Sequence, residues 1–287
     1  QVGIIAVVTV LFVTSSVSGV ARGVKLLSVG NLIAAAALAG VVFVLGPTVH
    51  IIDTFTNSLG GYASEFVRMS LRLTPFRDSS WVGSWTIFYW AWWLAWSPFV
   101  GLFIARVSRG RTIREFVLGV VIAPTLVAFL WFSIFGGAAL SLEIFQGAPL
   151  ADVAAKDSSL ALFAMLQQLP LATLTSIIGT LLVVVFFVTS GDSATLVLAT
   201  MSHGGADNPP HRSKIIWGVL IAGIAAALLL AGGVQAVQTA SIVFALPFTV
   251  VVVLMAVAVV RAIRADWEAD QKRQRALRRR MEQLVQP

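Results

Sequence analysis

The chain has 287 residues, of which 58% are hydrophobic and 11% are charged, and it carries a formal net charge of +7. Average soluble proteins have about 25% charged residues, so this composition excludes an ordinary water-soluble domain. The absence of cysteine excludes disulfides, thiolate metal sites and cysteine nucleophiles, and the three histidines are too scattered for a metal cluster. Because Gln1 opens the sequence inside an apolar run, we expect the C-terminal part of a longer protein.

Seven apolar segments are each long enough to cross a hydrocarbon core of about 30 Å. They cover residues 3–19, 29–52, 84–105, 116–138, 171–201, 215–231 and 236–260. Sixteen of the 20 Lys and Arg residues follow the first, third, fifth and seventh segments. By the positive-inside rule, this asymmetry predicts a multi-pass membrane protein whose C-terminus is cytoplasmic. It also accounts for the net positive charge without a nucleic-acid partner.

The segment after the second span, residues 54–73, is too amphipathic to cross the membrane. Its apolar residues recur at steps of three and four: Tyr62, Phe66, Met69 and Leu73. This pattern is typical of a helix that lies flat at the outer interface of the membrane. A short helix packed under a loop is the alternative interpretation.

The third span holds five of the nine tryptophans within twelve residues. Aromatic residues at steps of four and three form one stripe along a helix: Trp85, Tyr89, Trp92, Trp96 and Phe99. Trp92, Trp93 and Trp96 lie near the middle of the span, away from the interfaces at which tryptophan usually sits. Because the face of an indole ring attracts a quaternary ammonium group, these residues predict a site for an organic cation. Simple packing is the alternative.

The fifth span is interrupted by polar residues in the stretch FFVTSGDSAT, residues 186–195. Such a break at membrane depth is tolerated where it lines a cavity or binds a ligand. Thr189 and Ser190 offer hydroxyl oxygens, and the carbonyl of Phe186 would become available if Gly191 loosened the helix. Oxygen ligands suit a hard cation such as sodium. The alternative is that these hydroxyls donate to carbonyls four residues earlier in the helix.

Two further groups of polar residues lie within spans. Asp192 is the one carboxylate in the seven apolar cores, and it is a candidate cation ligand, a neighbour of a ligand or a partner for a basic loop residue. The stretch TSSVSG, residues 14–19, is typical of helix packing through small residues.

The tail, residues 261–287, contains eight basic and four acidic residues. This composition is typical of a solvated helix that touches anionic lipid headgroups. Arg278, Arg279 and Arg280 are the candidate regulatory residues, because attraction to headgroups weakens as ionic strength rises. An inert topology signal is the alternative.

The motifs FYWAWW, WSPFVG and ARVSRGRTIRE follow one another between Phe88 and Glu115, and WFSIFGG and FFVTSGDSA come later. With these motifs the chain resembles the betaine/choline/carnitine transporter family, and most of all its bacterial sodium-coupled glycine betaine symporters. The resemblance implies an all-α polytopic membrane protein, which consists of the second five-helix inverted repeat of a leucine-transporter-like fold and the last two helices of the first repeat.

The same resemblance implies a division of the chain into four parts. Residues 1–53 would hold the last two helices of the first repeat, and residues 54–80 the amphipathic helix and an outer link. Residues 81–260 would form the second repeat, and residues 261–287 the cytoplasmic tail.

Site residues follow from the resemblance position by position. Trp92, Trp93 and Trp96 match the family's aromatic box around a trimethylammonium group, and Phe99 matches a residue below that box on the substrate path. The carbonyl of Phe186, with Thr189 and Ser190, matches the sodium ligands that the second repeat contributes. Gly191 stands where alanine is usual in the family.

The function implied by the resemblance is uptake of glycine betaine by sodium symport with alternating access, regulated osmotically, in the bacterial plasma membrane. Sodium would be the coupling ion, no other cofactor is expected, and the protein would be a homotrimer that contacts anionic lipid. A choline or carnitine transporter or exchanger of the same family is the alternative, and a channel or membrane scaffold is the alternative from another class. An enzyme is not expected, because no paired carboxylates lie at depth.

Overall fold

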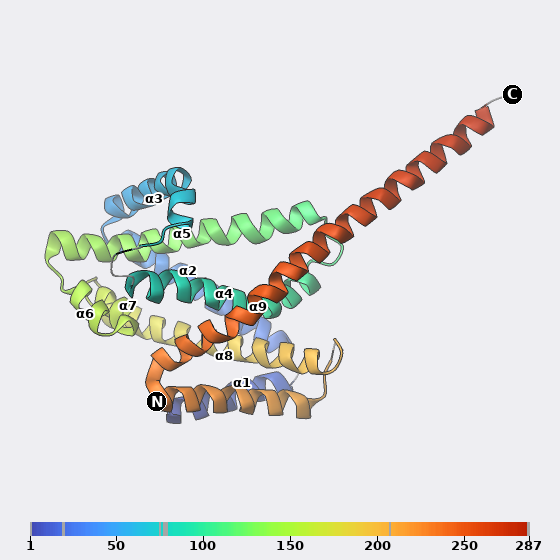
Figure 1. Ribbon diagram of the computed structural model, residues 1–287. Helices are drawn as coiled ribbons and strands as arrows, with labels where there is room; N and C mark the ends of the chain where they lie inside the picture. Colours follow the sequence, from blue (N-terminus) through green and yellow to red (C-terminus); the bar gives the residue numbers. More distant parts are fainter. Residues whose placement is uncertain (1, 19–20, 75, 77–79, 207, 286–287) are drawn as a thin grey trace. The chain divides into compact units, whose positions relative to one another are not determined.

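The computed structural model describes residues 2–18, 21–74, 76, 80–206 and 208–285. Every regular element in these residues is a helix, which confirms the all-α class (Figure 1). The elements are α1 (Val2–Ser18), α2 (Ala21–Leu45), α3 (Thr48–Ser70), the π-helix η1 (Val82–Ile87), α4 (Phe88–Val107), α5 (Ile113–Gln146), α6 (Leu150–Lys156), the 3-10 helix η2 (Ser158–Leu160), α7 (Ala161–Leu166), α8 (Ala172–Ser202) and α9 (His211–Val285).

The apolar segments expected from the sequence lie on these helices. In the described residues, four helical stretches are long and apolar enough to span a membrane: Leu26–Leu45, Ile113–Gln146, Ala172–Ser202 and His211–Arg278. The first and third expected segments lie on α1 and on α4 with η1. The sixth and seventh both lie on α9, where Gly232 and Gly233 have non-helical backbone and produce a kink at the expected boundary. The tail continues the second part of α9 as a helix.

The chain divides into two compact units. Unit 1 consists of Gln1–Leu73 and Leu102–Ala227, and it contains α1 to α3, α5 to α8 and the first part of α9. Unit 2 consists of Thr74–Gly101 and Leu228–Pro287, and it contains η1, most of α4 and the rest of α9.

The second span ends earlier than the sequence predicts. Helix α2 stops at Leu45 instead of residue 52, because Pro47 has no N–H group with which to continue a helix. A Cβ atom on Gly46 would lie 2.4 Å from the carbonyl oxygen of Val42, so this sharp turn requires glycine. Thr48 then starts α3, and its hydroxyl donates to the carbonyl of Phe43 over 2.7 Å.

Helix α3 carries the amphipathic segment and packs along α5 within unit 1 (Figure 1). His50 stacks on Phe145 with ring centroids 4.7 Å apart, and its Nδ1 lies 2.9 Å from Ser141 Oγ. Further along, the ring of Tyr62 meets Phe129 edge to face at 5.1 Å. The segment is therefore a helix, as predicted, and one face of it is packed on a neighbour.

The core of unit 1 forms where α2, α3, α5, α7 and α8 meet. It contains fully buried large side chains, among them Leu38, Val42, Ile51, Leu142 and Leu166. Glu143 joins this core to α6, because its carboxylate accepts from the backbone N–H groups of Leu150 and Ala151, at 2.6 and 2.9 Å.

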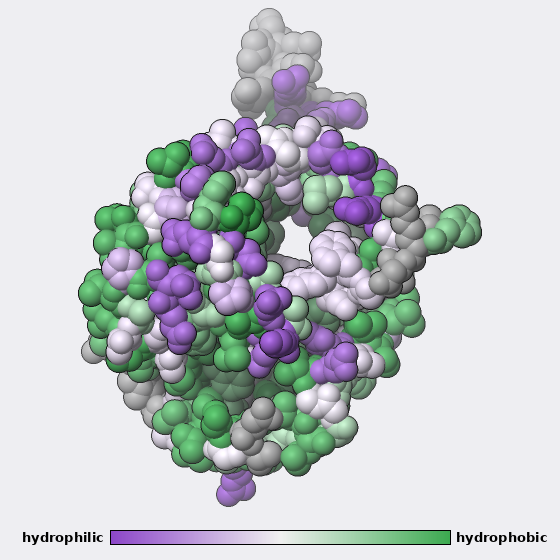
Figure 2. Space-filling view, turned by 90° about the vertical axis from the view of Figure 1, so that its left-hand side faces the viewer, coloured by the Kyte–Doolittle hydropathy of each residue, from purple (hydrophilic) through white to green (hydrophobic). Residues whose placement is uncertain are grey.

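Apolar side chains also cover the outside of the long helices. In the face shown in Figure 2, hydrophobic residues cover much of the surface and hydrophilic residues gather in its middle and upper part. Exposed Leu, Val, Ile and Phe residues occur along α2, α5, α8 and α9. Such surfaces are compatible with the hydrocarbon of a membrane. The side chains are apolar, and the backbone N–H and C=O groups of a helix bond to one another.

We predict that Leu142→Ala lowers the free energy of unfolding by about 2–5 kcal/mol, because it leaves a cavity in the core of unit 1. The measurement is an equilibrium unfolding titration in detergent. Leu140→Ala is the matched control on the same helix, since the Leu140 side chain is 58% exposed and leaves no cavity. Equal losses in the two variants would contradict the assignment of this core.

Candidate substrate and cation sites

The predicted aromatic stripe lies on η1 and α4, in unit 2. Trp85 stacks on Tyr89 with ring centroids 5.8 Å apart, and Tyr89 meets Trp92 edge to face at 5.8 Å. Trp96 continues the stripe to Phe99, with centroids 6.4 Å apart. The printed ring contacts thus form two groups along the helix, one from Trp85 to Trp92 and one from Trp96 to Phe99, on the residues of the stripe that the sequence predicts.

The three candidate box residues are open on the surface of unit 2. Trp92 and Trp96 are each 41% exposed and Trp93 is 68% exposed. Phe99 is half-buried. The large indole faces that unit 2 leaves uncovered can contact a cation, provided that other protein groups enclose the cation from the opposite side.

Ser97 and Pro98 shape the helix at the end of this stripe. Pro98 has no N–H group, so it cannot bond to the carbonyl of Leu94 four residues earlier. The hydroxyl of Ser97 donates to that carbonyl over 2.7 Å instead. The pair Ser97–Pro98 thus keeps α4 continuous between Trp96 and Phe99, a role that the sequence analysis did not assign.

The predicted cation ligands lie on α8, in unit 1. The hydroxyl of Thr189 donates to the carbonyls of Val185 and Phe186, at 2.9 and 3.1 Å. The structure therefore brings two of the three candidate ligand oxygens together, and it also shows the backbone bonding that was the alternative interpretation. Ser190 is exposed on the same helix. A hydroxyl that donates to a carbonyl keeps its lone pairs, so this donor set still fits a sodium ion on one side.

Gly191 does not loosen the helix, the condition under which the sequence analysis would free the Phe186 carbonyl. Helix α8 runs unbroken from Ala172 to Ser202. Gly191 serves packing instead: a Cβ atom at this position would lie 2.9 Å from Cδ1 of Phe12, a buried residue of α1. The glycine provides room for an aromatic ring and does not break the helix.

The two candidate sites belong to different units of the chain. Trp92, Trp93, Trp96 and Phe99 lie in unit 2, whereas Phe186, Thr189 and Ser190 lie in unit 1. Within its own unit, each group is presented by one helix.

The candidate regulatory residues lie near the end of α9. Arg278 is exposed. The side chains of Arg279 and Arg280 lie outside the described residues. The helix itself continues through all three positions.

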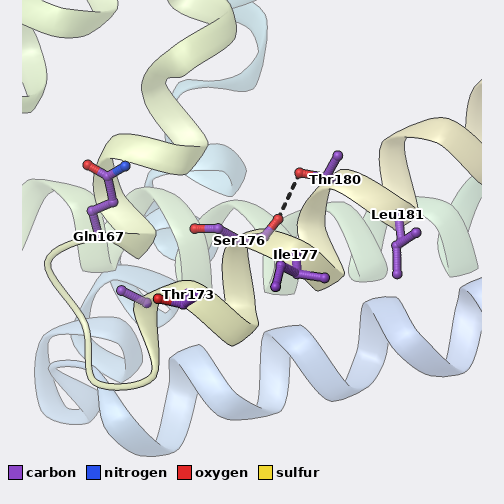
Figure 3. Close-up of a pocket in the computed structure, with 7 residues that line it drawn as sticks. Gln167, Thr173, Ser176, Ile177, Thr180 and Leu181 are labelled. Carbon is purple, nitrogen blue, oxygen red and sulfur yellow. Dashed lines mark hydrogen bonds between the residues drawn. The ribbon is translucent and has the colours of Figure 1, made fainter.

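A cavity of about 430 Å³ at the start of α8 was not predicted from the sequence. Figure 3 shows Gln167, from the end of α7, together with Thr173, Ser176 and Thr180 along α8. The three hydroxyl residues recur at steps of three and four, a signal that the sequence did contain. No charged side chain lines this cavity among the described residues, so it offers neutral hydrogen bonds only.

Comparison with known proteins identifies the family. Residues 1–268 match the betaine/carnitine/choline family of transporters (BCCT). The chain belongs to this family. The match to BCCT transporters covers the tryptophan stripe and the hydroxyls of α8, and it ends before Arg278, Arg279 and Arg280.

Individual relatives support the same assignment. The ectoine/hydroxyectoine transporter of Virgibacillus pantothenticus is 46% identical over 275 residues, which cover 96% of this chain and 55% of the relative. The glycine betaine transporter OpuD of Bacillus subtilis is 49% identical over 257 residues, which cover 89% of this chain and 50% of the relative. A glycine betaine transporter of Acinetobacter baylyi is 42% identical over 267 residues, which cover 93% of this chain and 40% of the relative.

This chain thus spans about half the length of the curated relatives that it matches. The family and these relatives are transporters and not enzymes, as the sequence analysis expected. Together with the apolar helices, the family assignment makes the chain part of a multi-pass membrane protein.

We predict that Trp92→Ala, Trp93→Ala and Trp96→Ala each weaken binding of a quaternary ammonium substrate by about 1–2 kcal/mol in the full-length protein, on the scale of a desolvated cation–π contact. Replacement by Phe should cost less, because an aromatic face remains. Equilibrium binding of radiolabelled glycine betaine to purified protein measures the effect.

Trp81→Ala is the matched control, since Trp81 is also exposed in unit 2 but lies before the stripe. Parental affinity in all three alanine variants, with normal insertion, would reassign the stripe to packing.

Proposed function

We propose that the full-length protein takes up glycine betaine, or a close analogue, together with sodium by alternating access. The observation that carries this proposal is the row of indole rings on α4, with three tryptophans open on the helix surface. The chain has few other means to neutralise a fixed organic cation at membrane depth, since Asp192 is the one carboxylate in its apolar cores. Cation–π attraction supplies that stabilisation without a counter-ion.

Sodium coupling is proposed from the oxygens on α8. The carbonyl of Phe186 and the hydroxyl of Thr189 lie together, and Ser190 adds a second hydroxyl on the next residue. Neutral oxygens suit an alkali cation that has to bind and leave in each cycle. If sodium binds more tightly to the conformation that also binds substrate, its inward gradient drives uptake of a zwitterion that cannot cross lipid unaided.

The choice of substrate rests on the relatives. OpuD and the Acinetobacter protein are named as glycine betaine transporters, whereas the Virgibacillus relative is named as an ectoine/hydroxyectoine transporter. Ectoine is therefore the second candidate substrate, and choline or carnitine is the third. Competition by unlabelled ectoine, choline and carnitine against labelled betaine ranks these candidates.

The setting of the transporter is part of the same proposal. Sixteen of the 20 basic residues lie on the side of the C-terminus, which supports a plasma-membrane protein with a cytoplasmic tail. The exposed basic helix at the end of α9 suits contact with anionic headgroups. We also propose a homotrimer, to which α3 would contribute exposed apolar residues such as Phe66 and Met69.

The deciding experiment is uptake of radiolabelled glycine betaine by the full-length protein in proteoliposomes, with and without an inward sodium gradient. Accumulation above the external concentration that requires sodium supports the proposal. Sodium-independent exchange would indicate an exchanger of the same family. A channel would equilibrate the solute without concentrating it.

We predict that the double variant Thr189→Ala/Ser190→Ala raises the sodium concentration needed for half-maximal uptake by about tenfold or more, since two ligand oxygens are lost. Betaine affinity measured at low sodium should fall as well, because the two binding equilibria are linked. Uptake at varied sodium and fixed betaine gives both values.

Ser176→Ala/Thr180→Ala is the matched control. It removes two hydroxyls from the same helix, and Thr180, like Thr189, donates to a carbonyl four residues earlier. Unchanged sodium activation in the Thr189/Ser190 variant would leave these two residues a packing role.

We predict that deletion of residues 270–287 abolishes activation by external osmolality and leaves basal uptake intact. The deletion removes six basic residues, Lys272, Arg273, Arg275, Arg278, Arg279 and Arg280, each of which contributes about 1 kcal/mol of attraction near an anionic leaflet. The measurement is betaine uptake by proteoliposomes as the external osmolality is raised in steps. An unchanged activation curve would restrict the tail to a role in topology.

A further inference from the structure

A groove of about 310 Å³ lies between α2 and α8 in unit 1. Leu27 of α2 and Leu181 and Val185 of α8 are among the apolar side chains that line it. Leu27 is 53% exposed and Leu181 is 59% exposed, so both have open space beside them. Among the described residues, neither the proposed sodium ligands nor the tryptophans of α4 line this groove, which is therefore a separate feature of the molecule.

The groove has one polar side chain among its described lining residues, Asn31 of α2. Asn31 is 6% exposed, and its amide nitrogen Nδ2 is buried without a hydrogen-bond partner in the described part of the chain. Buried donors without an acceptor cost free energy and are uncommon in native proteins. Asn31 lies in a helical stretch that is apolar enough to span a membrane, where water does not supply the acceptor. A group that occupies the groove therefore has to supply it.

The small residues beside Asn31 indicate what kind of group this is. Gly30 and Ala34 are four residues apart on α2, so they lie one turn apart on one face, and both line the groove. A Cβ atom at Gly30 would meet no atom of another helix within 4 Å, so the described chain leaves this face open. Small residues at this spacing let the backbones of two membrane helices approach closely, and asparagine side chains hydrogen-bond across such interfaces.

A helix therefore fits this groove better than a lipid tail does, because an acyl chain offers Asn31 no acceptor. A helix offers its side-chain hydroxyls, and it offers free backbone carbonyls wherever it is interrupted. An interface with a small-residue face and an asparagine also has a geometry that acyl chains do not require. The amide and the Gly30–Ala34 face thus point to the same class of occupant.

The rest of the full-length protein is the source of such a helix. Within unit 1, α1 packs on α8 near Gly191 and α3 packs on α5, so both of these helices are engaged elsewhere. The chain spans about half of the length of its relatives, so a comparable length of those proteins has no counterpart here. That uncovered half provides further chain from which the occupant can come.

We propose that the groove between α2 and α8 seats a transmembrane helix from the half of the full-length protein that lies outside these 287 residues. Asn31 donates its amide to a carbonyl or hydroxyl oxygen of that helix. Gly30 and Ala34 allow its close approach, and Leu27 and Leu181 pack against its sides. The inference goes beyond the proposed function, because it depends neither on the transported solute nor on the coupling ion.

The first test is photocross-linking of the full-length protein in membranes. The variant Leu181→benzoylphenylalanine places a photoreactive group in the groove and keeps Asn31. Irradiation should give a cross-link within one molecule to a peptide from outside these 287 residues, identified by mass spectrometry. Val183→benzoylphenylalanine is the matched control, since Val183 is 54% exposed on α8 but does not line the groove. It should not cross-link to that peptide.

The second test measures the sign of a stability change in the full-length protein in detergent. If Asn31 has a partner in another helix, Asn31→Leu leaves that acceptor buried and unpaired, so the thermal unfolding midpoint should fall by about 2 °C or more. If Asn31 has no partner, the same substitution removes an unpaired amide, and the midpoint should stay or rise. Asn57→Leu is the control, because Asn57 is exposed on α3, and it should leave the midpoint unchanged.

Several results would overturn the inference. The cross-link from position 181 could join a lipid, a second copy of the protein or the residues of unit 2, or it could fail to form. A parental or raised midpoint in Asn31→Leu would also contradict the proposal. If Asn31→Leu fails to insert, the cross-link alone decides, since its variants retain Asn31. Neither readout requires sodium or betaine, so a failure of the proposed function is distinguishable from a failure of this inference.

Discussion

The constraint on which the structure depends is that a polar group inside an apolar helix finds no water and has to bond within the protein. The helices meet this constraint through specific side chains. Ser97 donates to the carbonyl that Pro98 leaves without a partner, and Thr48 donates across the break that Pro47 imposes. The hydroxyl of Thr189 donates to carbonyls of its own helix and keeps its lone pairs. The polar residues that mark candidate sites thus first solve a problem of helix stability.

Much of the fold could be predicted because its signals are local in sequence. Apolar segments, the glycines that kink α9 and the steps of four and three in the tryptophan stripe depend on residues within a few turns of one another. The early end of α2 was missed although Gly46 and Pro47 were visible, because hydrophobicity continues across them into α3. Hydrophobicity alone does not separate a membrane span from an amphipathic helix such as α3, which packs on α5.

The candidate sites were predicted less completely, and the reason is distance along the chain. The donors on α8 share one segment of sequence, so their proximity could be predicted, but the contacts around them come from α1 and α9. The sequence allows Gly191 to loosen the helix, whereas in the structure the ring of Phe12 on α1 fills the space beside it. Likewise, TSSVSG was interpreted as packing through small residues, and its contact with the start of α9, where the Ser16 carbonyl accepts from Lys214, was not predicted. No local pattern contains these relations.

The placement of each proposed set of ligand groups on one helix has a consequence for transport. The tryptophans proposed to bind substrate lie on α4, and the hydroxyls proposed to bind sodium lie on α8, so in the proposed mechanism neither helix alone encloses its ligand. The full binding energy is then available only when further protein groups contact the ligand from the other side. That energy favours the conformation that encloses the ligand over the open conformation. If the helix that bears the proposed ligand groups is already rigid before binding, less conformational entropy is lost when the ligand is enclosed. For that reason, Ser97, whose hydroxyl donates to the Leu94 carbonyl beside Pro98, is expected to influence substrate affinity through the helix that it holds in place.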